Sequence, residues 1–160
     1  MTPWPDDVER VAAFLRSAAA EARIEEFDAE TASAADAAQA VGCEPSEIVK
    51  SLVVLGDGRP FLALIPGDRR GDLEKIARAA GTSAARIAKP DEVVALTGFV
   101  PGAVAPFPLP RIERVLVDRH LLACDGVWVG AGSSRHMATL PTPELVRLTK
   151  AAPADLVSEI

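Results

Sequence analysis

Apolar residues recur along the chain at two different spacings. In some segments they return every third or fourth residue, which is typical of one buried face of a helix. The first such segment follows Asp6 and Asp7, whose charges favour a helix start. Ser33 and Gly42 are suited to begin and end the second one. The spacing predicts helices at residues 6–22, 34–41, 72–80, 91–96 and 142–148.

Other short segments are rich in apolar and β-branched residues, which is typical of strands. They predict strands at residues 24–28, 49–55, 61–65, 115–118, 127–131 and 137–140. Gly56-Asp57-Gly58 separates two of these strands and favours a hairpin. The strands come in pairs with helices between the pairs. This order predicts an α+β fold, a single compact domain over residues 1–160 with a mixed, largely antiparallel sheet flanked by helices.

Charge changes the expected class of partner. The chain has 17 basic and 23 acidic side chains, a formal charge of −6, which argues against a protein that coats nucleic acid with a basic face. The charge is uneven, however. Residues 1–47 carry 3 basic and 11 acidic side chains, whereas residues 48–160 carry 14 and 12. A nucleic acid held through only a few phosphates remains compatible with this balance.

Several classes of protein are not expected. The first residues lack a basic segment followed by an apolar one, so we expect no signal peptide and a cytoplasmic protein. Residues 93–110 carry no charge, but their four prolines would interrupt a membrane-spanning helix. Cys43 and Cys124 are too few for a disulfide framework and are expected to be buried thiols. No phosphate loop and no spacing of metal ligands occurs, so neither a cofactor nor a metal is expected.

Three segments carry candidate chemistry, each with a structural alternative. Lys50 in IVKSLVVL is either a strand-edge lysine that reaches water or a cation that grips a phosphate. TGFVPGAVAPFPLP is either a rigid surface loop or a backbone that presents amide N–H groups to a carbonyl oxygen. His136, after the small-residue turn in WVGAGSSRHMATL, is either a structural residue or a base. His120 is expected to be structural.

Taken together and in order, these segments resemble the YbaK/EbsC family of aminoacyl-tRNA deacylases. The same domain occurs as the editing insertion of bacterial prolyl-tRNA synthetases. The resemblance covers residues 31–148 and rests on five segments: TASAADAAQAVGC, IVKSLVV, PGDRRGDLEKIA, TGFVPGAVAPF and VGAGSSRHMATLPTPEL. It implies hydrolysis, without a metal, of the ester that joins a wrong amino acid to the acceptor end of tRNA.

The resemblance also implies roles for individual residues. Lys50 would anchor the terminal adenosine or its phosphate, and the backbone of residues 102–106 would hold the scissile carbonyl and water. The turn of residues 132–136 would line the amino-acid side of the pocket, with His136 acting as a base or only shaping it. The expected catalytic residues are Lys50, Gly102, Pro106 and His136. The expected substrate-binding residues are Thr31, Ser51, Gly98, Ala103, Gly130, Gly132, Ser133 and Arg135.

Three functions stay open at this point. The first is a trans-acting editing hydrolase for tRNA(Pro)-type substrates, which receives its substrate after release or through a synthetase partner. The second is a non-catalytic module that binds an aminoacyl-adenosine or a synthetase, and the third is an esterase for a small activated ester. No oligomeric state is predicted. Phosphate contacts are expected from Lys50 with some of Arg69, Arg70, Arg111, Arg114 and Arg135.

Overall fold

The computed structural model describes residues 4–28, 30–31 and 33–159. The helices of this part are α1 (Asp6–Ser17), α2 (Ala34–Val41), α3 (Leu73–Ala80), α4 (Pro90–Thr97) and α5 (Thr142–Thr149), with 3-10 turns η1 (Pro45–Glu47) and η2 (Arg119–Ala123). The strands are β1 (Arg23–Glu26), β2 (Val49–Gly56), β3 (Arg59–Pro66), β4 (Ala85–Ile87), β5 (Arg114–Asp118), β6 (Gly126–Ser133), β7 (His136–Pro141) and β8 (Ala152–Ala154).

The strands form two sheets. One is antiparallel with the order β1-β7-β6, and the other has the order β4-β2-β3-β5-β8. In the larger sheet β5 runs parallel to both β3 and β8, while β2 is antiparallel to β3 and β4. A parallel bridge between Ile48 and Trp128 connects the sheets. The α+β class and the largely antiparallel pairing are therefore confirmed, although the strands divide between two sheets where we expected one.

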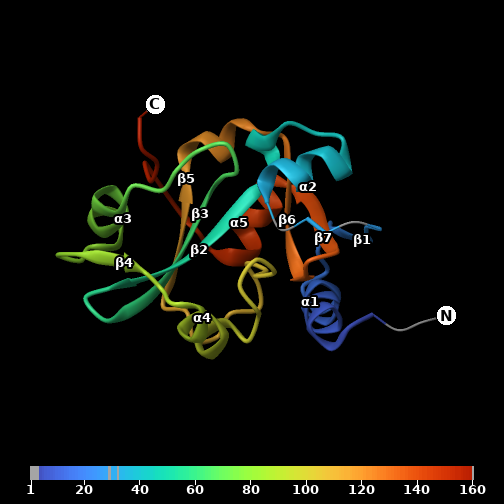
Figure 1. Cartoon of the computed structure of the whole chain (residues 1–160), viewed down its shortest axis with the longest axis horizontal. Helices are drawn as coiled ribbons and strands as arrows, with labels where there is room; N and C mark the ends of the chain where they lie inside the picture. The colour runs from blue at the N-terminus through green and yellow to red at the C-terminus, as the bar shows by residue number, and fades with distance from the viewer. Residues whose placement is uncertain (1–3, 29, 32, 160) are drawn as a thin grey trace.

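The core fills the space between the two sheets. Its largest cluster combines Val53 and Leu62 of the larger sheet with Val127 and Ala138 of the smaller one, and Leu145 of α5 packs against them. A second cluster packs α3 against the opposite face of the larger sheet. Figure 1 shows how the helices and strands are arranged, with α3 and β4 at one end of the molecule and α1 and β1 at the other. Burying one such side chain stabilises the fold by roughly 1.5–3 kcal/mol.

Helix ends follow the expected local chemistry. The Ser33 hydroxyl accepts a hydrogen bond from the Asp36 amide, 3.0 Å away, and so caps α2. The Asp72 carboxylate caps α3 in the same way through the amides of Glu74 and Lys75. Gly42, Gly81 and Gly98 end α2, α3 and α4 with left-handed backbone angles. A cap of this kind contributes about 1 kcal/mol.

One expectation about the elements is wrong, and two strands were not expected. The first helix ends at Ser17 rather than near residue 22, because Ala19 adopts a left-handed backbone (φ 50°). The amide of Ala20 then donates a hydrogen bond back to the carbonyl oxygen of Leu15. Alanine favours a helix, so the local composition gave no sign of this turn. The short edge strands β4 and β8 were not predicted, since three residues are too few to show alternation.

Candidate active site

A cavity of about 550 Å³ opens where α2, β2, the loop after α4 and the β6–β7 hairpin meet. Its lining is made mostly of small and polar residues. They are Thr31, Ser33, Ala34, Ala35, Ile48, Val49, Lys50, Ser51, Leu52, Gly67, Gly102, Val104, Gly130, Ser133, His136 and Met137. Seven of the expected site residues are among them: Thr31, Lys50, Ser51, Gly102, Gly130, Ser133 and His136.

Lys50 lies on the part of β2 that pairs with a single neighbouring strand among the described residues. It pairs with Ile65 of β3, whereas β4 reaches β2 only at Val54–Gly56. Residues 49–52 of β2 line the cavity. The ammonium donates a hydrogen bond to the carbonyl oxygen of Arg69, 3.4 Å away, and no acidic side chain of the described residues forms an ion pair with it. Lys50 is thus an exposed cation whose charge is free to meet an anionic ligand.

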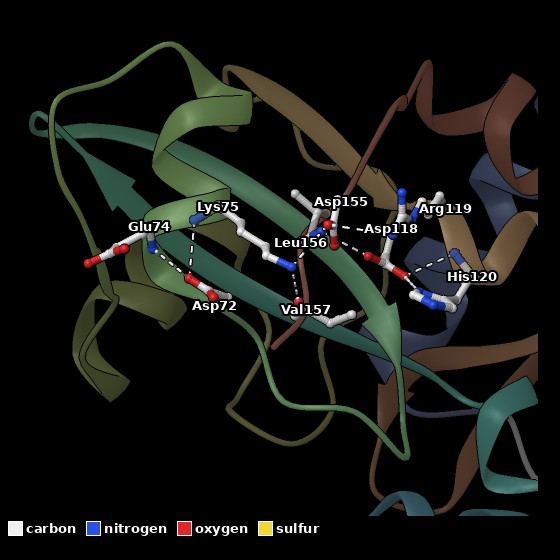
Figure 2. A network of polar contacts seen from close by, with 9 residues as sticks. All are labelled: Asp72, Glu74, Lys75, Asp118, Arg119, His120, Asp155, Leu156 and Val157. Atoms are coloured by element: carbon white, nitrogen blue, oxygen red, sulfur yellow. Dashed lines mark hydrogen bonds and ion pairs between the residues drawn. The ribbon is translucent and has the colours of Figure 1, made fainter. Parts of the chain in front are cut away.

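The loop that accepts this hydrogen bond is fixed by the C-terminal residues. Lys75 donates to the Asp155 carboxylate (2.9 Å) and to the Val157 carbonyl oxygen (2.8 Å), and Ser158 donates its amide to the carbonyl oxygen of Arg70. Figure 2 shows the contacts of Lys75 with Asp155 and Val157 beside the polar network around Asp118. The hydrogen bond from Lys75 lowers the pKa of Asp155. The C-terminal residues therefore hold the Arg69–Arg70 segment beside Lys50.

Asp118 is fully buried and gives His120 a structural contact. Its carboxylate accepts hydrogen bonds from the amides of His120 and Leu156, and the His120 ring nitrogen Nδ1 lies 2.7 Å from it. His120 does not line the cavity.

The loop after α4 brings backbone groups to the cavity. Gly102 has a positive φ of 86°, a backbone angle that glycine adopts without strain. Among the described residues, none accepts a hydrogen bond from the amide N–H of Gly102 or of Val104. The loop lies tight against β6, because the Ala103 carbonyl oxygen accepts a hydrogen bond from the Gly132 amide at 3.1 Å. Two unpaired amides at a cavity wall can stabilise a negatively charged oxygen.

The β6–β7 turn supplies a serine–histidine pair. The Ser133 hydroxyl accepts a hydrogen bond from the Arg135 amide (3.0 Å) and lies 2.5 Å from Nδ1 of His136. The hydroxyl and the ring nitrogen can each donate or accept in this contact, and the ring tautomer decides which of them donates. Nε2 lies 3.2 Å from the Glu26 carboxylate but lacks the alignment of a hydrogen bond. His136 is buried, with 3 % of its surface exposed. Its surroundings and the contact with Ser133 hold the ring in place.

Thr31 and Ser51 both line the cavity and differ in their hydrogen bonds. Thr31 donates both its amide and its hydroxyl to the carbonyl oxygen of Ser134, at 2.6 and 2.9 Å, and so ties the start of α2 to the hairpin turn. The Ser51 hydroxyl oxygen is buried and has no hydrogen-bond partner among the described residues. Because a buried unpaired hydroxyl is costly, Ser51 is suited to bind a polar group of a ligand.

Five expected site residues do not line this cavity. Pro106 lies instead on a second, mostly apolar hollow beside Phe14. Ala103 is a buried residue of the loop, and Gly98 ends α4 against the guanidinium of Arg10. Gly132 packs on the backbone of α1, and the Arg135 guanidinium turns away to the carbonyl oxygen of Asp28. These residues shape the surroundings of the cavity and do not face its interior.

Sequence reasoning missed part of the wall. Ala34 and Gly67 both line the cavity, and a Cβ at Gly67 would stand 2.5 Å from the Cβ of Ala34. Gly67 therefore allows α2 to approach the end of β3. The segment PGDRRGDLEKIA contributes to the family resemblance, but the partner that requires Gly67 is 33 positions away in the sequence and gives no local signal.

Other chemistries find little support. Burial raises the pKa of both Cys43 and Cys124, with nearby acidic side chains adding to the effect, so neither thiol is poised as a nucleophile. No three His, Cys, Asp or Glu side chains within the described ranges gather in a way that could hold a metal ion. In the same ranges, no helix is long and apolar enough to cross a membrane.

Comparison with known proteins gives a consistent result. The sequence profile of the aminoacyl-tRNA editing domain matches residues 28–148. A proline–tRNA ligase of Coprothermobacter proteolyticus is 30 % identical over 133 residues, which is 79 % of this chain but 23 % of that enzyme. The candidate Cys-tRNA(Pro)/Cys-tRNA(Cys) deacylase EbsC of Enterococcus faecalis is 26 % identical over 128 residues, with 79 % of this chain and 78 % of EbsC aligned.

A solved structure agrees over nearly the whole chain. A candidate trans-editing enzyme for prolyl tRNA synthetase superposes with a TM-score of 0.91 and 36 % identity, covering 98 % of this chain and all of that one. By contrast, the chain spans only about a quarter of the length of the proline–tRNA ligases that it matches. The chain therefore belongs to the aminoacyl-tRNA editing domain family.

Proposed function

We propose that this protein is a trans-acting deacylase that hydrolyses the ester of mischarged tRNA, with tRNA(Pro)-type substrates. One observation carries the proposal: a single cavity is lined by the exposed cation Lys50 and by Gly102 and Val104, whose amides have no acceptor in the described part of the chain. An aminoacyl-tRNA has matching chemistry, because its reactive carbonyl lies next to the phosphates of the 3′ end. The tRNA(Pro) preference is supported by the similarity to proline–tRNA ligases.

The proposed reaction needs little from side chains. Water attacks the carbonyl carbon, the C–O bond to the ribose breaks, and the ribose oxygen leaves with a proton. The amides of Gly102 and Val104 stabilise the oxyanion, and the neighbouring ribose hydroxyl of the substrate relays the proton. Because the ester is already activated, we propose that no metal takes part. His136 shapes the amino-acid side of the cavity, held by Ser133.

Lys50 is proposed to hold the terminal adenosine or its phosphate, together with Arg69 and Arg70 on the adjacent loop. None of these three side chains forms an ion pair with the described acidic residues, so their charges are available. Arg111 and Arg135 are less suited, because their guanidinium groups donate to the carbonyl oxygens of Ala95 and Asp28, away from the loop beside Lys50. Arg114 lies on the second hollow. We propose a cytoplasmic site of action, with a synthetase as a further partner.

The test is deacylation of a panel of tRNA(Pro) charged with Cys, Ala, Ser or Thr, with correctly charged Pro-tRNA(Pro) as the control. Release of at least one wrong amino acid, with Pro-tRNA(Pro) left intact, is the expected result. Absence of hydrolysis across the panel would contradict the proposal. If a non-hydrolysable aminoacyl-adenosine analogue still bound saturably, a non-catalytic binding module would replace it. Turnover of small esters that uncharged tRNA does not inhibit would favour a general esterase.

A further inference from the structure

The N-terminal residues 4–17 lie before the stretch that the family profile matches, yet they contact the walls of the cavity. The Trp4 ring meets the His136 ring edge to face, with centroids 5.8 Å apart. The backbone of Asp7 lies very close to Gly132. A Cβ at Gly132 would stand 2.8 Å from the carbonyl group of Asp7. Helix α1 is thereby anchored on the β6–β7 hairpin.

Arg10 projects from the same helix to the other wall. Its Nη2 donates to the carbonyl oxygen of Thr97, the last residue of α4, at 3.2 Å. Its Cζ lies 4.2 Å from the ring centroid of Phe99, which is fully buried. The guanidinium also occupies the space beside Gly98, where a Cβ would stand 2.7 Å from Nη1. One side chain therefore contacts three consecutive residues at the start of the cavity loop.

These contacts lie directly before Gly102 and Val104. The loop begins with hydrogen bonds from the Phe99 amide to the Thr97 hydroxyl and from the Ala103 amide to the Val100 carbonyl oxygen. A guanidinium suits these two partners, because its flat face stacks on the Phe99 ring while its edge donates to the Thr97 carbonyl oxygen. A lysine or an apolar side chain could make only part of this contact.

We infer that Arg10 is a positioning residue for deacylation, which holds the cavity loop so that its free amides meet the substrate carbonyl. The inference rests on the proposed function. Arg10 acts through the loop and does not line the cavity. Oxyanion donors lose much of their effect when displaced by a fraction of an ångström, so a loosened loop should slow the chemical step more than it weakens tRNA binding.

The test compares Arg10→Met with Arg16→Met, which removes an exposed arginine from the same helix. With the tRNA that the wild type deacylates best, Arg10→Met should lower kcat about tenfold or more and change KM less than about twofold. Arg16→Met should match the wild type. Guanidinium ions added to Arg10→Ala should restore part of kcat. Thermal unfolding of each variant shows whether it is folded at the assay temperature.

Amide hydrogen exchange provides a measurement that needs no substrate. In Arg10→Met, the amides of Phe99 and Ala103 should exchange faster than in the wild type, while amides of the β2–β3 hairpin should be unchanged. Unchanged exchange at Phe99 and Ala103, or a kcat equal to that of Arg16→Met, would overturn the inference. If the wild type hydrolyses no aminoacyl-tRNA, the proposed function fails, and the exchange result still decides whether Arg10 holds the loop.

Discussion

The carbonyl oxygen of Val104 lies against Gly130, so close that a Cβ at Gly130 would stand 2.5 Å from it. The two residues come from the cavity loop and from β6, and both line the cavity. The atoms that a Cβ at Gly130 would meet belong to the backbone of the loop, so no flexible side chain could move aside to make room for it. This contact sets the distance between the loop and the hairpin.

Replacing Gly130 with alanine should therefore push the loop off β6. We expect kcat for deacylation to fall about tenfold or more, because the amides of Gly102 and Val104 move with the loop. Gly126→Ala on the same strand is the matched control, since its Cβ would meet the Leu140 carbonyl oxygen at an ordinary 3.5 Å. Equal kinetics for the two variants would show that the contact does not position the loop.

Removing the Ser133 hydroxyl should destabilise the hairpin turn. Ser133→Ala leaves Nδ1 of the buried His136 without its partner, so the free energy of unfolding should drop by about 1–3 kcal/mol. Urea denaturation measures the change. Ser134→Ala provides the control, because Ser134 accepts hydrogen bonds only through its backbone oxygen. A Ser133→Ala variant as stable as Ser134→Ala would contradict the assignment.

The Arg86–Glu92 pair predicts a pH dependence of stability. The hydrogen bond from Arg86 lowers the pKa of Glu92 from 4.5 to about 2. A carboxyl whose pKa is lower in the folded state stabilises the protein above its unfolded pKa, and this contribution is lost as the pH falls from about 4.5 to about 2. Glu92→Gln should therefore lose less stability than the wild type over this range, as measured by urea denaturation at each pH. Parallel curves for the two proteins would exclude this contribution.

Binding of uncharged tRNA should depend only shallowly on salt. If Lys50, Arg69 and Arg70 contact about three phosphates of a single strand, the plot of log K against log salt should have a slope of about −2. Arg69→Met should reduce that slope by about 0.7, since one contact is lost. Fluorescence anisotropy with labelled tRNA measures both values. A slope several times steeper would mean that the tRNA lies along a much larger basic surface.

The local parts of the fold could be predicted from the sequence. Ser33, Gly42 and the Gly56–Gly58 turn mark element ends through their own backbone chemistry, and the structure confirms each. The division into two sheets could not be predicted, because it depends on which strands pair across long separations. Arg23 of β1 pairs with Thr139 of β7, for example, and no local pattern indicates that pairing.

The same distinction holds for the site. Lys50, Gly102 and His136 were singled out by residue type and by resemblance, and they line one cavity. Pro106 and Gly132 belong to the same motifs, yet they face other parts of the molecule. A motif identifies a segment but does not say which of its residues face the cavity. Arg10 lies outside every motif, and only its contacts with Thr97 and Phe99 point to a role.

The most direct test of the proposed active site compares the rates at which the wild type and Lys50→Ala release the amino acid from the same mischarged tRNA(Pro). Arg78→Ala, which removes an exposed cation from α3, is the control. We predict that the wild type and Arg78→Ala deacylate this tRNA at the same rate, whereas Lys50→Ala is slower by about a hundredfold while remaining folded. A Lys50→Ala protein that deacylates as fast as the wild type would contradict the placement of the active site in this cavity.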